Sequence, residues 1–505
     1  MNRHTYAITG MDCAEEIAIL KRVSGPLAGG EDKFSFDLLN GRMIVESERP
    51  VSDDEVIKVV AHAAPFYALI TTSRFQGHSK RPPNWRCPRL KKYWPVSFFS
   101  IILLATAVQA TANEGVFLSG YDSVQLQRMN SGVASPRNAS WLILNPAGIG
   151  ALDELDGDKD LNRQLDLNLY AVFTDVEFNP GGLAGNPFQG TLDGDGTFVI
   201  PSCGIIWPLT EKHTVGLGLY TLSGAGVEYE GPRNVLGFLG NSDRQLSYSH
   251  TRLALGYSYE INEGLYIGIS LQGSLSRFKT DHQTLQLMPT RGDNQPDYAP
   301  GYGLSAGIYK KWDRWGLGAS YWSRHVVERF DDYSDLLQYP IDLPQSVQLG
   351  GAYEIIDDML EVTVDLRWID WNDIATFGRP VNRGGFDWND QFGIRAGLEL
   401  KASRKLTLRA GFSYTNTPIE RDHIFTAALV PVLSQQHIAA GFTYELFDGH
   451  EVSLTGIYAM RKQMEETGAG VFDGDFLSPL GKGSDLTTSG YAVSLGYTIK
   501  WGGRS

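Results

Sequence analysis

The first residues able to do chemistry lie near the N-terminus, between Gly10 and Glu16. Cys13 and Glu16 are close enough in sequence for a thiolate and a carboxylate to reach one ion, and Asp12 lies beside them. Thiolates favour soft and borderline metals, and a mixed sulfur and oxygen set suits a zinc-like divalent metal. A loop that binds no metal is the other interpretation, and the sequence leaves both open. No other cofactor is required.

Two further patterns resemble reactive sites but lack the context that such sites need. Residues Gly303 to Gly307 match G-x-S-x-G, the hydrolase pattern whose serine sits on a sharp turn from strand to helix. Here Ser305 falls in the middle of a predicted strand. Residues 156–160 begin like a calcium loop, but Leu161 stands where the turn glycine belongs. We therefore expect that the chain is not an enzyme and has no calcium site.

The remaining candidates depend on segments after residue 160 in which apolar and polar residues alternate. From Leu360 to Trp368, every even-numbered residue is apolar and every odd-numbered residue is polar. A strand places successive side chains on opposite faces, so this segment has one apolar and one polar face. In a soluble sandwich the apolar face is buried. In an outer-membrane barrel it meets lipid, and the polar face lines the lumen.

The connections between these segments decide between the two architectures. Connections after odd-numbered segments are long, whereas those after even-numbered segments are tight, such as 401–404 and 447–450. Long loops on one side and short periplasmic turns on the other are typical of outer-membrane barrels. We therefore predict a mainly β protein with a 14-stranded antiparallel transmembrane barrel over residues 161–501. The predicted strands are 165–176, 197–207, 213–221, 247–259, 264–275, 302–311, 313–322, 344–354, 359–368, 390–400, 405–414, 436–446, 451–460 and 489–500.

Composition excludes two other classes of protein. The mean hydropathy of the 505 residues is -0.20, too low for a helical membrane protein, whose spans need about twenty apolar residues each. A net charge of -14 argues against a general nucleic-acid surface. Tryptophans near strand ends are expected to form a girdle at the membrane interface. They are Trp207, Trp315, Trp322, Trp368, Trp371 and Trp501.

The first 112 residues divide into three parts. Residues 1–72 follow a βαββαβ order, and 73–92 form a basic, proline-containing linker. Residues 93–112 have the apolar core and A-x-A site of a signal peptide, with cleavage expected after Ala112. Residues before about 113 are then absent from the mature protein. We hypothesise that 1–89 come from a misplaced start or a gene fusion, with an alternative start at Leu90.

The N-terminal module resembles the heavy-metal-associated domain of metal-transporting P-type ATPases. The usual motif there is Met-x-Cys-x-x-Cys, and this chain carries Glu16 in place of the second cysteine. The resemblance implies a ferredoxin-like fold. The substitution leaves metal binding in doubt, so the module is either a metal-binding domain or a vestigial one.

The barrel half is similar to the FadL family of outer-membrane transporters for long-chain fatty acids and other hydrophobic molecules. The similarity covers residues 113–501 and includes Ser131 to Ala134, Asn145 to Ile149 and Leu343 to Gly350. It implies a hatch formed by residues 113–160 that plugs the barrel, with Asn145, Pro146 and Ala147 as the hatch motif. It also implies a kink in the third strand, here at Ser223, Gly224 and Gly226, that opens a lateral exit into the membrane.

The same resemblance implies that extracellular loops capture the ligand and pass it to a lumenal pocket, without an energy source. An anionic head group can pair with lumenal arginines, although pairing with lumenal acids is the alternative. The expected ligand-binding residues are Leu285, Leu287, Met288, Leu336, Leu337, Arg367, Arg395 and Arg409.

The expected partners follow from the same interpretation. They are a hydrophobic small molecule, outer-membrane lipid and lipopolysaccharide, and the barrel-assembly machinery, with no nucleic acid and a monomeric chain in a Gram-negative outer membrane. Aromatic hydrocarbon uptake and a non-specific porin or structural barrel remain alternatives. An outer-membrane lipase is a further one, but His250 and His437 lie near strand ends with no evident partner.

Overall fold

The computed structural model describes residues 2–9, 30, 33–37, 42–47, 68–71, 114–152, 163–181, 191–230, 244–281 and 290–502. The chain divides into two compact units, Met1–Lys92 and Tyr93–Ser505. The first unit contains one antiparallel sheet in the order β2-β3-β1-β4. These strands are β1 (Asn2–Thr9), β2 (Phe34–Asp37), β3 (Arg42–Ser47) and β4 (Ala68–Thr71). The expected helices, Cys13 and Glu16 all lie outside the described residues.

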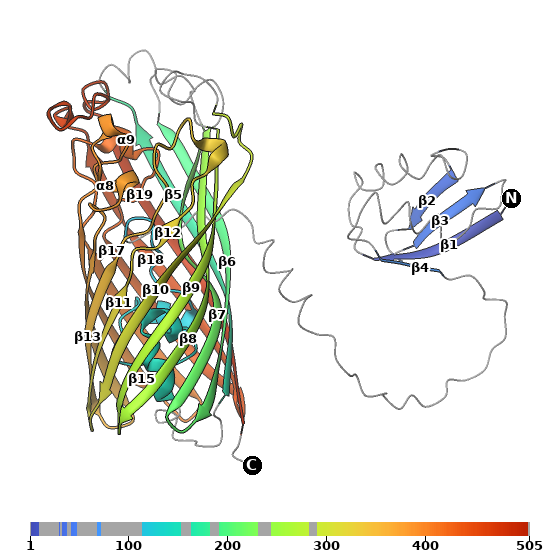
Figure 1. Cartoon of the computed structure of the whole chain (residues 1–505), viewed down its shortest axis with the longest axis vertical. Helices are drawn as coiled ribbons and strands as arrows, with labels where there is room; N and C mark the ends of the chain where they lie inside the picture. Colours follow the sequence, from blue (N-terminus) through green and yellow to red (C-terminus); the bar gives the residue numbers. More distant parts are fainter. Residues whose placement is uncertain are drawn as a thin grey trace. The chain divides into compact units, whose positions relative to one another are not determined.

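The second unit is a closed antiparallel barrel of fourteen strands, which confirms the predicted fold (Figure 1). Successive strands pair from β5 to β19, and pairing between β19 and β5 closes the ring. A two-residue strand, β12 (Val326–Val327), adds to β10. The wall strands are β5 (Arg163–Asn179), β6 (Leu192–Thr210), β7 (His213–Glu230), β8 (Arg244–Asn262), β9 (Leu265–Thr280), β10 (Asp297–Lys311), β11 (Trp315–Trp322), β13 (Ser346–Ile356), β14 (Leu360–Ile369), β15 (Gln391–Lys401), β16 (Leu406–Thr415), β17 (Gln436–Phe447), β18 (His450–Glu465) and β19 (Asp485–Trp501).

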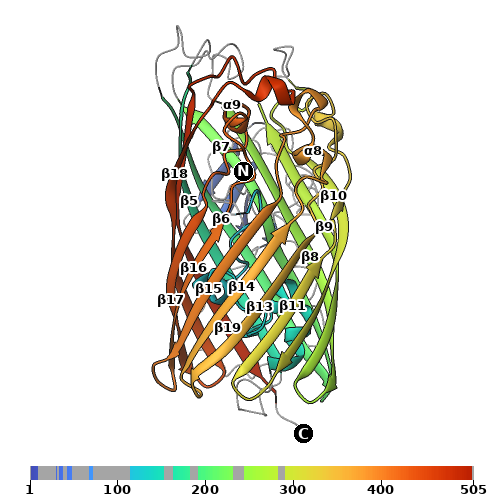
Figure 2. The ribbon, with the colours of Figure 1, turned by 90° about the vertical axis from the view of Figure 1, so that its left-hand side faces the viewer.

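The alternation of apolar and polar residues in the sequence corresponds to the outer and inner faces of the barrel wall. On β14, Val364 and Leu366 are 45% and 56% exposed and face outward, whereas Asp365 and Arg367 are buried inside. Short turns join the strands at one end of the barrel, and long loops gather at the other (Figure 2). Within the described residues, the loops carry five short helices. These are η4 (Asp331–Tyr333), α8 (Ala375–Gly378), η5 (Val381–Arg383), α9 (Ile424–Ala427) and η6 (Gly470–Asp473).

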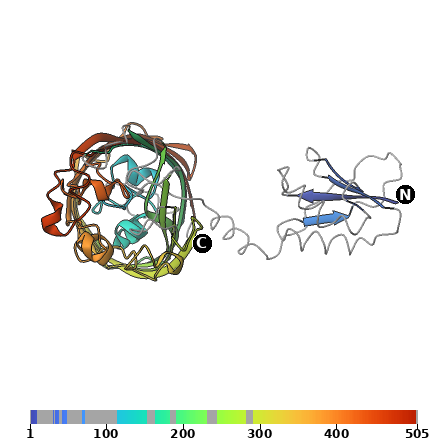
Figure 3. The ribbon, with the colours of Figure 1, turned by 90° about the horizontal axis from the view of Figure 1, so that it is seen from above.

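The described part of the hatch, residues 114–152, lies inside the ring of strands (Figure 3). Its elements are α4 (Ser123–Gln127), α5 (Trp141–Leu144) and η3 (Pro146–Ala151). The hatch backbone lies directly against the wall where the wall carries glycine. A Cβ atom at Gly268 would overlap the backbone of Pro146 and Ala147, and one at Gly318 would overlap the backbone of Val133. At these two glycines, the backbone of the hatch therefore contacts the wall without an intervening side chain.

The prediction of an aromatic girdle is partly wrong. Trp207 and Trp315 are 41% and 56% exposed, as a girdle requires. Trp322 and Trp371 are instead buried inside the barrel, where their indole N–H groups donate to Ile143 O at 3.0 Å and Gln391 Oε1 at 2.8 Å. A position near a strand end does not reveal which face a tryptophan occupies.

Candidate functional site

The wall of the barrel is interrupted between β6 and β7. These strands pair at Asp193–Asp195 with Glu228–Glu230 and again from Cys203 onward, but not between these two stretches. On its other side, β7 shifts register against β8 between Thr221 and Ser223. The residues of β7 from Tyr220 to Ala225 are all buried, so the strand turns inward instead of alternating between two faces. Of the predicted kink residues, Ser223 and Gly224 lie in this part of β7, and Gly226 directly follows it.

The beginning of the hatch pairs with this inward part of β7. Leu118 N donates to Leu222 O at 3.0 Å, and Gly224 N donates to Val116 O at 2.9 Å. The Ser223 hydroxyl also donates to Val116 O at 2.9 Å. Residues 116–118 therefore supply backbone partners to a strand that has left its neighbour β6.

An apolar cavity of about 170 Å³ adjoins the same place. It contacts the hatch through Val116 and the β7 strand through Ala225, and four loops and two wall strands, β8 and β9, contribute the rest of its described lining. Leu336 and Leu337, two of the predicted ligand-binding residues, belong to this lining. The other predicted loop residues, Leu285, Leu287 and Met288, lie outside the described part of the chain. The remaining lining residues are Leu246, Tyr248, Phe278, Gln338, Ile341, Thr376, Phe377, Val381, Gly384, Gly385, Phe386, Thr426, Leu429, Val430 and Leu477.

Glu114, the first described residue of the hatch, is bound to the wall opposite β7. Its Oε2 atom accepts from Arg367 Nη1 on β14 at 2.7 Å, and its Oε1 atom forms an ion pair with Arg395 on β15. All three side chains are buried. Residues 114–118 thus form a strap across the lumen. Ion pairs to Arg367 and Arg395 hold its first residue, and backbone hydrogen bonds to β7 hold its other end.

The predicted hatch motif lies against the wall of the barrel at β9 and β10. Asn145 Oδ1 accepts from Ala147 N at 3.2 Å and caps η3, whose first residue is Pro146. Its amide group donates to Val133 O at 2.8 Å and to Ile308 O on β10 at 3.1 Å. One side chain therefore satisfies backbone groups of the hatch and of the wall, as irregular buried structure requires.

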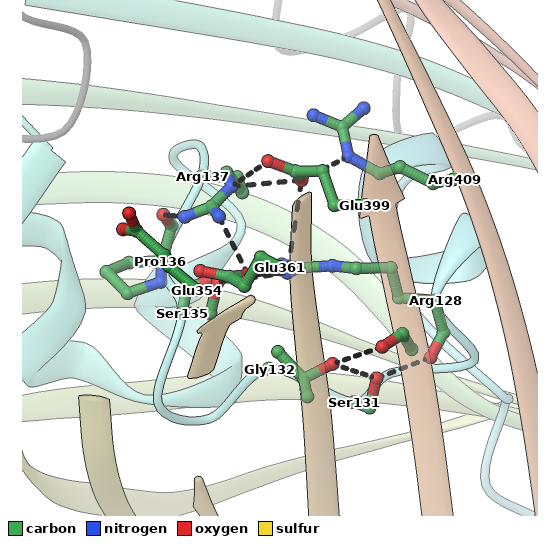
Figure 4. Close-up of polar contacts among 12 residues, drawn as sticks. Arg128, Ser131, Gly132, Ser135, Pro136, Arg137, Glu354, Glu361, Glu399 and Arg409 are labelled. Carbon is green, nitrogen blue, oxygen red and sulfur yellow. Dashed lines mark hydrogen bonds and ion pairs between the residues drawn. The ribbon is translucent and has the colours of Figure 1, made fainter. Parts of the chain in front are cut away.

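A network of charges holds the middle of the hatch to β14, β15 and β16. Arg137 lies between two carboxylates, with Nη2 at 2.8 Å from Glu361 Oε1 and Nε at 3.0 Å from Glu399 Oε1 (Figure 4). Arg128 lies 3.2 Å from Glu361, and Arg409 Nε lies 2.6 Å from Glu399 Oε2. Breaking a buried pair leaves an uncompensated charge, so this network fixes the hatch more firmly than surface pairs would.

The three predicted arginines therefore all contact carboxylates of the protein itself. Arg367 and Arg395 bind Glu114, and Arg409 binds Glu399. Their assignment as ligand contacts stays a prediction.

The serine of the G-x-S-x-G pattern lies in the middle of β10. Ser305 is buried, and its hydroxyl accepts from Gln272 Nε2 at 3.0 Å. The expectation that His250 lacks a partner is wrong. Its Nε2 atom accepts from Arg252 Nε at 2.9 Å, so the proton on Nδ1 points to Ser276 Oγ at 2.7 Å.

Sequence reasoning missed Glu114 and Arg252. Glu114 precedes the first regular element of the hatch, so no periodicity singled it out. Arg252 occupies a polar position of the predicted strand 247–259, the same signal that singled out Arg367 and Arg395. Among the described residues, no group of three or more His, Cys, Asp or Glu side chains is arranged to hold a metal ion. Nor does this part of the chain contain a helix with the length and apolar character to cross a membrane.

Comparison with known proteins gives a match over most of the chain. The family model described as outer membrane protein transport protein (OMPP1/FadL/TodX) matches residues 103–500. A putative outer membrane protein of Neisseria meningitidis serogroup B is 30% identical over 141 residues, which span 26% of this chain and 28% of that relative. The chain thus matches less than a third of that relative's length.

Solved structures share the fold at low identity. The toluene transporter TodX of Pseudomonas putida has a TM-score of 0.59 and 17% identity, over 77% of this chain and all of that one. A FadL homologue of Pseudomonas aeruginosa has a TM-score of 0.56 and 14% identity, again over 77% of this chain and all of that one.

Proposed function

Since the chain belongs to the outer membrane protein transport family (OMPP1/FadL/TodX), we propose that it carries hydrophobic compounds passively across the outer membrane, by way of the apolar cavity and a lateral exit between β6 and β7. One observation supports this route most. Val116 and Ala225 line the cavity, and both lie at the place where β7 leaves β6. A hydrophobic solute that enters here can pass from loops to lipid without crossing water, which is the favourable path for apolar surface.

The size and lining of the cavity favour a small apolar cargo. A cavity of about 150 Å³ lined by Leu, Ile and Phe is known to stay dry and to bind benzene. The present cavity, at about 170 Å³, is of that size, and none of its described lining residues carries a charge. An aromatic hydrocarbon such as toluene, the compound named for the Pseudomonas relative, is therefore the first cargo to test.

Toluene uptake is the direct test of this function. Cells that produce the barrel are expected to take up labelled toluene several-fold faster than cells carrying an empty vector. Liposomes containing the purified barrel are expected not to swell in isotonic sugar, because the hatch fills the lumen. Rapid swelling would indicate an open porin instead, and unchanged uptake of both toluene and oleate would contradict transport of hydrophobic compounds.

One observation favours a second cargo class, an amphipathic carboxylate such as a fatty acid. Arg252 is 2% exposed, and its hydrogen bonds go to His250 and to Gln272 Oε1, at 2.8 Å for the latter. No carboxylate of the described residues forms an ion pair with it, whereas the other buried arginines of the lumen each contact a glutamate. A buried cation without a counter-charge is costly, and a ligand carboxylate would relieve that cost.

The position of Arg252 fits a ligand with an apolar tail. Tyr248, His250 and Arg252 lie two residues apart on β8 and so share one face of the strand, the face opposite to the exposed Leu253. Tyr248 lines the apolar cavity, and its side chain is buried. A tail in the cavity can therefore place a head group toward Arg252.

Replacement of Arg252 distinguishes the two cargo classes. Arg252→Gln is expected to weaken oleate binding about tenfold or more, the usual effect of losing one charge-assisted hydrogen bond, and to leave toluene binding unchanged. Arg252→Lys keeps the charge and is the matched control, with most of the oleate affinity retained. An equal loss of oleate and toluene binding would show that Arg252 acts on the fold alone.

A further inference from the structure

Three of the loops that line the apolar cavity meet at one buried histidine. His423 lies in the loop 416–435, directly before α9, and is 3% exposed. Its Nδ1 atom lies 3.1 Å from Asp475 Oδ2 in the loop 466–484, and its Nε2 atom lies 3.2 Å from Asp387 Oδ2 in the loop 370–390. Both ring nitrogens thus face a carboxylate oxygen. An imidazole can donate to two acceptors only when both nitrogens carry a proton, so the geometry suits the imidazolium.

The two carboxylates are not equivalent. Asp475 is fully buried and also accepts from Thr426 Oγ1 at 2.9 Å and from Leu477 N at 2.9 Å. These donors hold the Asp475 carboxylate in place. Asp387 is more exposed, and its carboxylate joins the loop 370–390 to the other two loops through His423.

The same loops supply the extracellular lining of the cavity. Thr426 and Leu477 are immediate neighbours of the charged group and line the cavity, as does Phe386, which precedes Asp387. Displacement of any of the three loops would therefore change the cavity. The neighbouring Glu466 accepts from Phe425 N at 3.1 Å and Ser478 Oγ at 2.7 Å, which ties two of the loops independently of His423.

From this arrangement we propose that His423 is a positioning residue for the ligand site: in its doubly protonated form it holds the three loops over the cavity, and its loss of a proton releases the loop 370–390 and speeds ligand exchange. The proposal rests on the cavity being the ligand site. It predicts that binding depends on pH even when the ligand itself has no titratable group.

The direction of the pH effect follows from the charges around His423. Burial by itself would lower the pKa of His423, but the hydrogen bond to Asp475 and the charges of Asp475, Asp387 and Asp422 together raise it above its ordinary value of 6.5. A raised pKa means that the stabilisation is complete below pH 6.5 and is lost as the pH rises through the higher value of the folded protein. A second effect acts at low pH. Burial raises the pKa of Asp387 above its ordinary value of 3.8, so the ion pair between Asp387 and His423 also weakens in strong acid.

Naphthalene is a suitable probe, because it is fluorescent, apolar and uncharged at every pH. Its dissociation rate from the purified, detergent-solubilised barrel is expected to rise about tenfold between pH 6 and pH 9, the change that loss of one charge-assisted hydrogen bond produces. His423→Gln is expected to dissociate quickly at both values. His450→Gln, a histidine bonded to Tyr497 at the other end of the barrel, is the control and should retain the pH dependence of the unaltered protein.

Hydrogen exchange of the loops gives a second readout that needs no ligand. Residues 370–390 are expected to lose protection between pH 6 and pH 9, after correction for the intrinsic rate, in the unaltered chain and not in His423→Gln. A pH-independent dissociation rate with unchanged loop protection would overturn the role of His423 and leave the transport function standing. Failure of naphthalene to bind at any pH would count against the cavity as ligand site, while the exchange measurement would still test the charged contact.

Discussion

Replacement of Glu114 by glutamine is expected to release the strap from the wall of the barrel. The change leaves Arg367 and Arg395 buried without their shared counter-charge. Removal of one partner from a buried pair typically costs about 3–5 kcal/mol. A loss of about 3 kcal/mol in the free energy of local opening corresponds to roughly a hundredfold faster amide exchange. The amides of residues 116–118 are the ones to measure, because they lie between Glu114 and β7.

Two variants make this result interpretable. Glu114→Asp keeps the negative charge and is expected to retain most of the protection. Glu451→Gln removes a partner of Lys500 from a partly exposed pair, whose contribution is small, and so controls for the loss of one acid. Unchanged protection in Glu114→Gln would mean that backbone bonds to β7 suffice to hold the strap.

Replacement of Ala225 by tryptophan is expected to abolish uptake while leaving the barrel assembled. Ala225 lines the cavity and is 3% exposed, so an indole at this position fills the space between the cavity and the break in the wall. Overpacking of this kind costs about 1–3 kcal/mol, which is expected to leave the closed barrel folded. Uptake of toluene is expected to fall at least tenfold, to the level of cells carrying an empty vector.

Leu217→Trp is the matched control for this variant. Leu217 lies on the same strand but is 38% exposed on the outer face, so the same new side chain meets lipid. Heat-dependent mobility on gels would show that both variants fold. Normal uptake through Ala225→Trp would exclude the cavity from the route, whereas equal losses in both variants would point to a general defect of β7.

The sequence was sufficient for the fold because its strongest signal, a period of two, is imposed separately on each strand by the contrast between lipid and lumen. All fourteen strands lie where the alternation predicted them. The largest difference is informative. The third strand was predicted to end at 221, but β7 continues to Glu230. Its residues from Tyr220 to Ala225 are buried on both faces, so the alternation disappears where the strand bends inward.

The contacts of the site could not be predicted in the same way. Glu114 and Arg367 are far apart in the sequence and meet only because the hatch crosses the lumen. The charged contact of His423 likewise joins three loops whose sequences have no common pattern. Leucines in the long loops predicted an apolar lining, and Leu336 and Leu337 do line the cavity. The aromatic residues Phe377 and Phe386 also line it, but no sequence pattern singled them out.

The close contact of the hatch with glycines of the wall also constrains the order of assembly. The backbone of Pro146 and Ala147 occupies the space that a side chain at Gly268 would need, and Val133 does the same at Gly318. A hatch in this position cannot enter a closed barrel as an already folded unit. The chain leads from the hatch into β5, and the last strand, β19, closes against β5. We therefore expect the β19–β5 seam to form while the hatch backbone already lies against the wall, so that barrel closure and hatch folding are coupled.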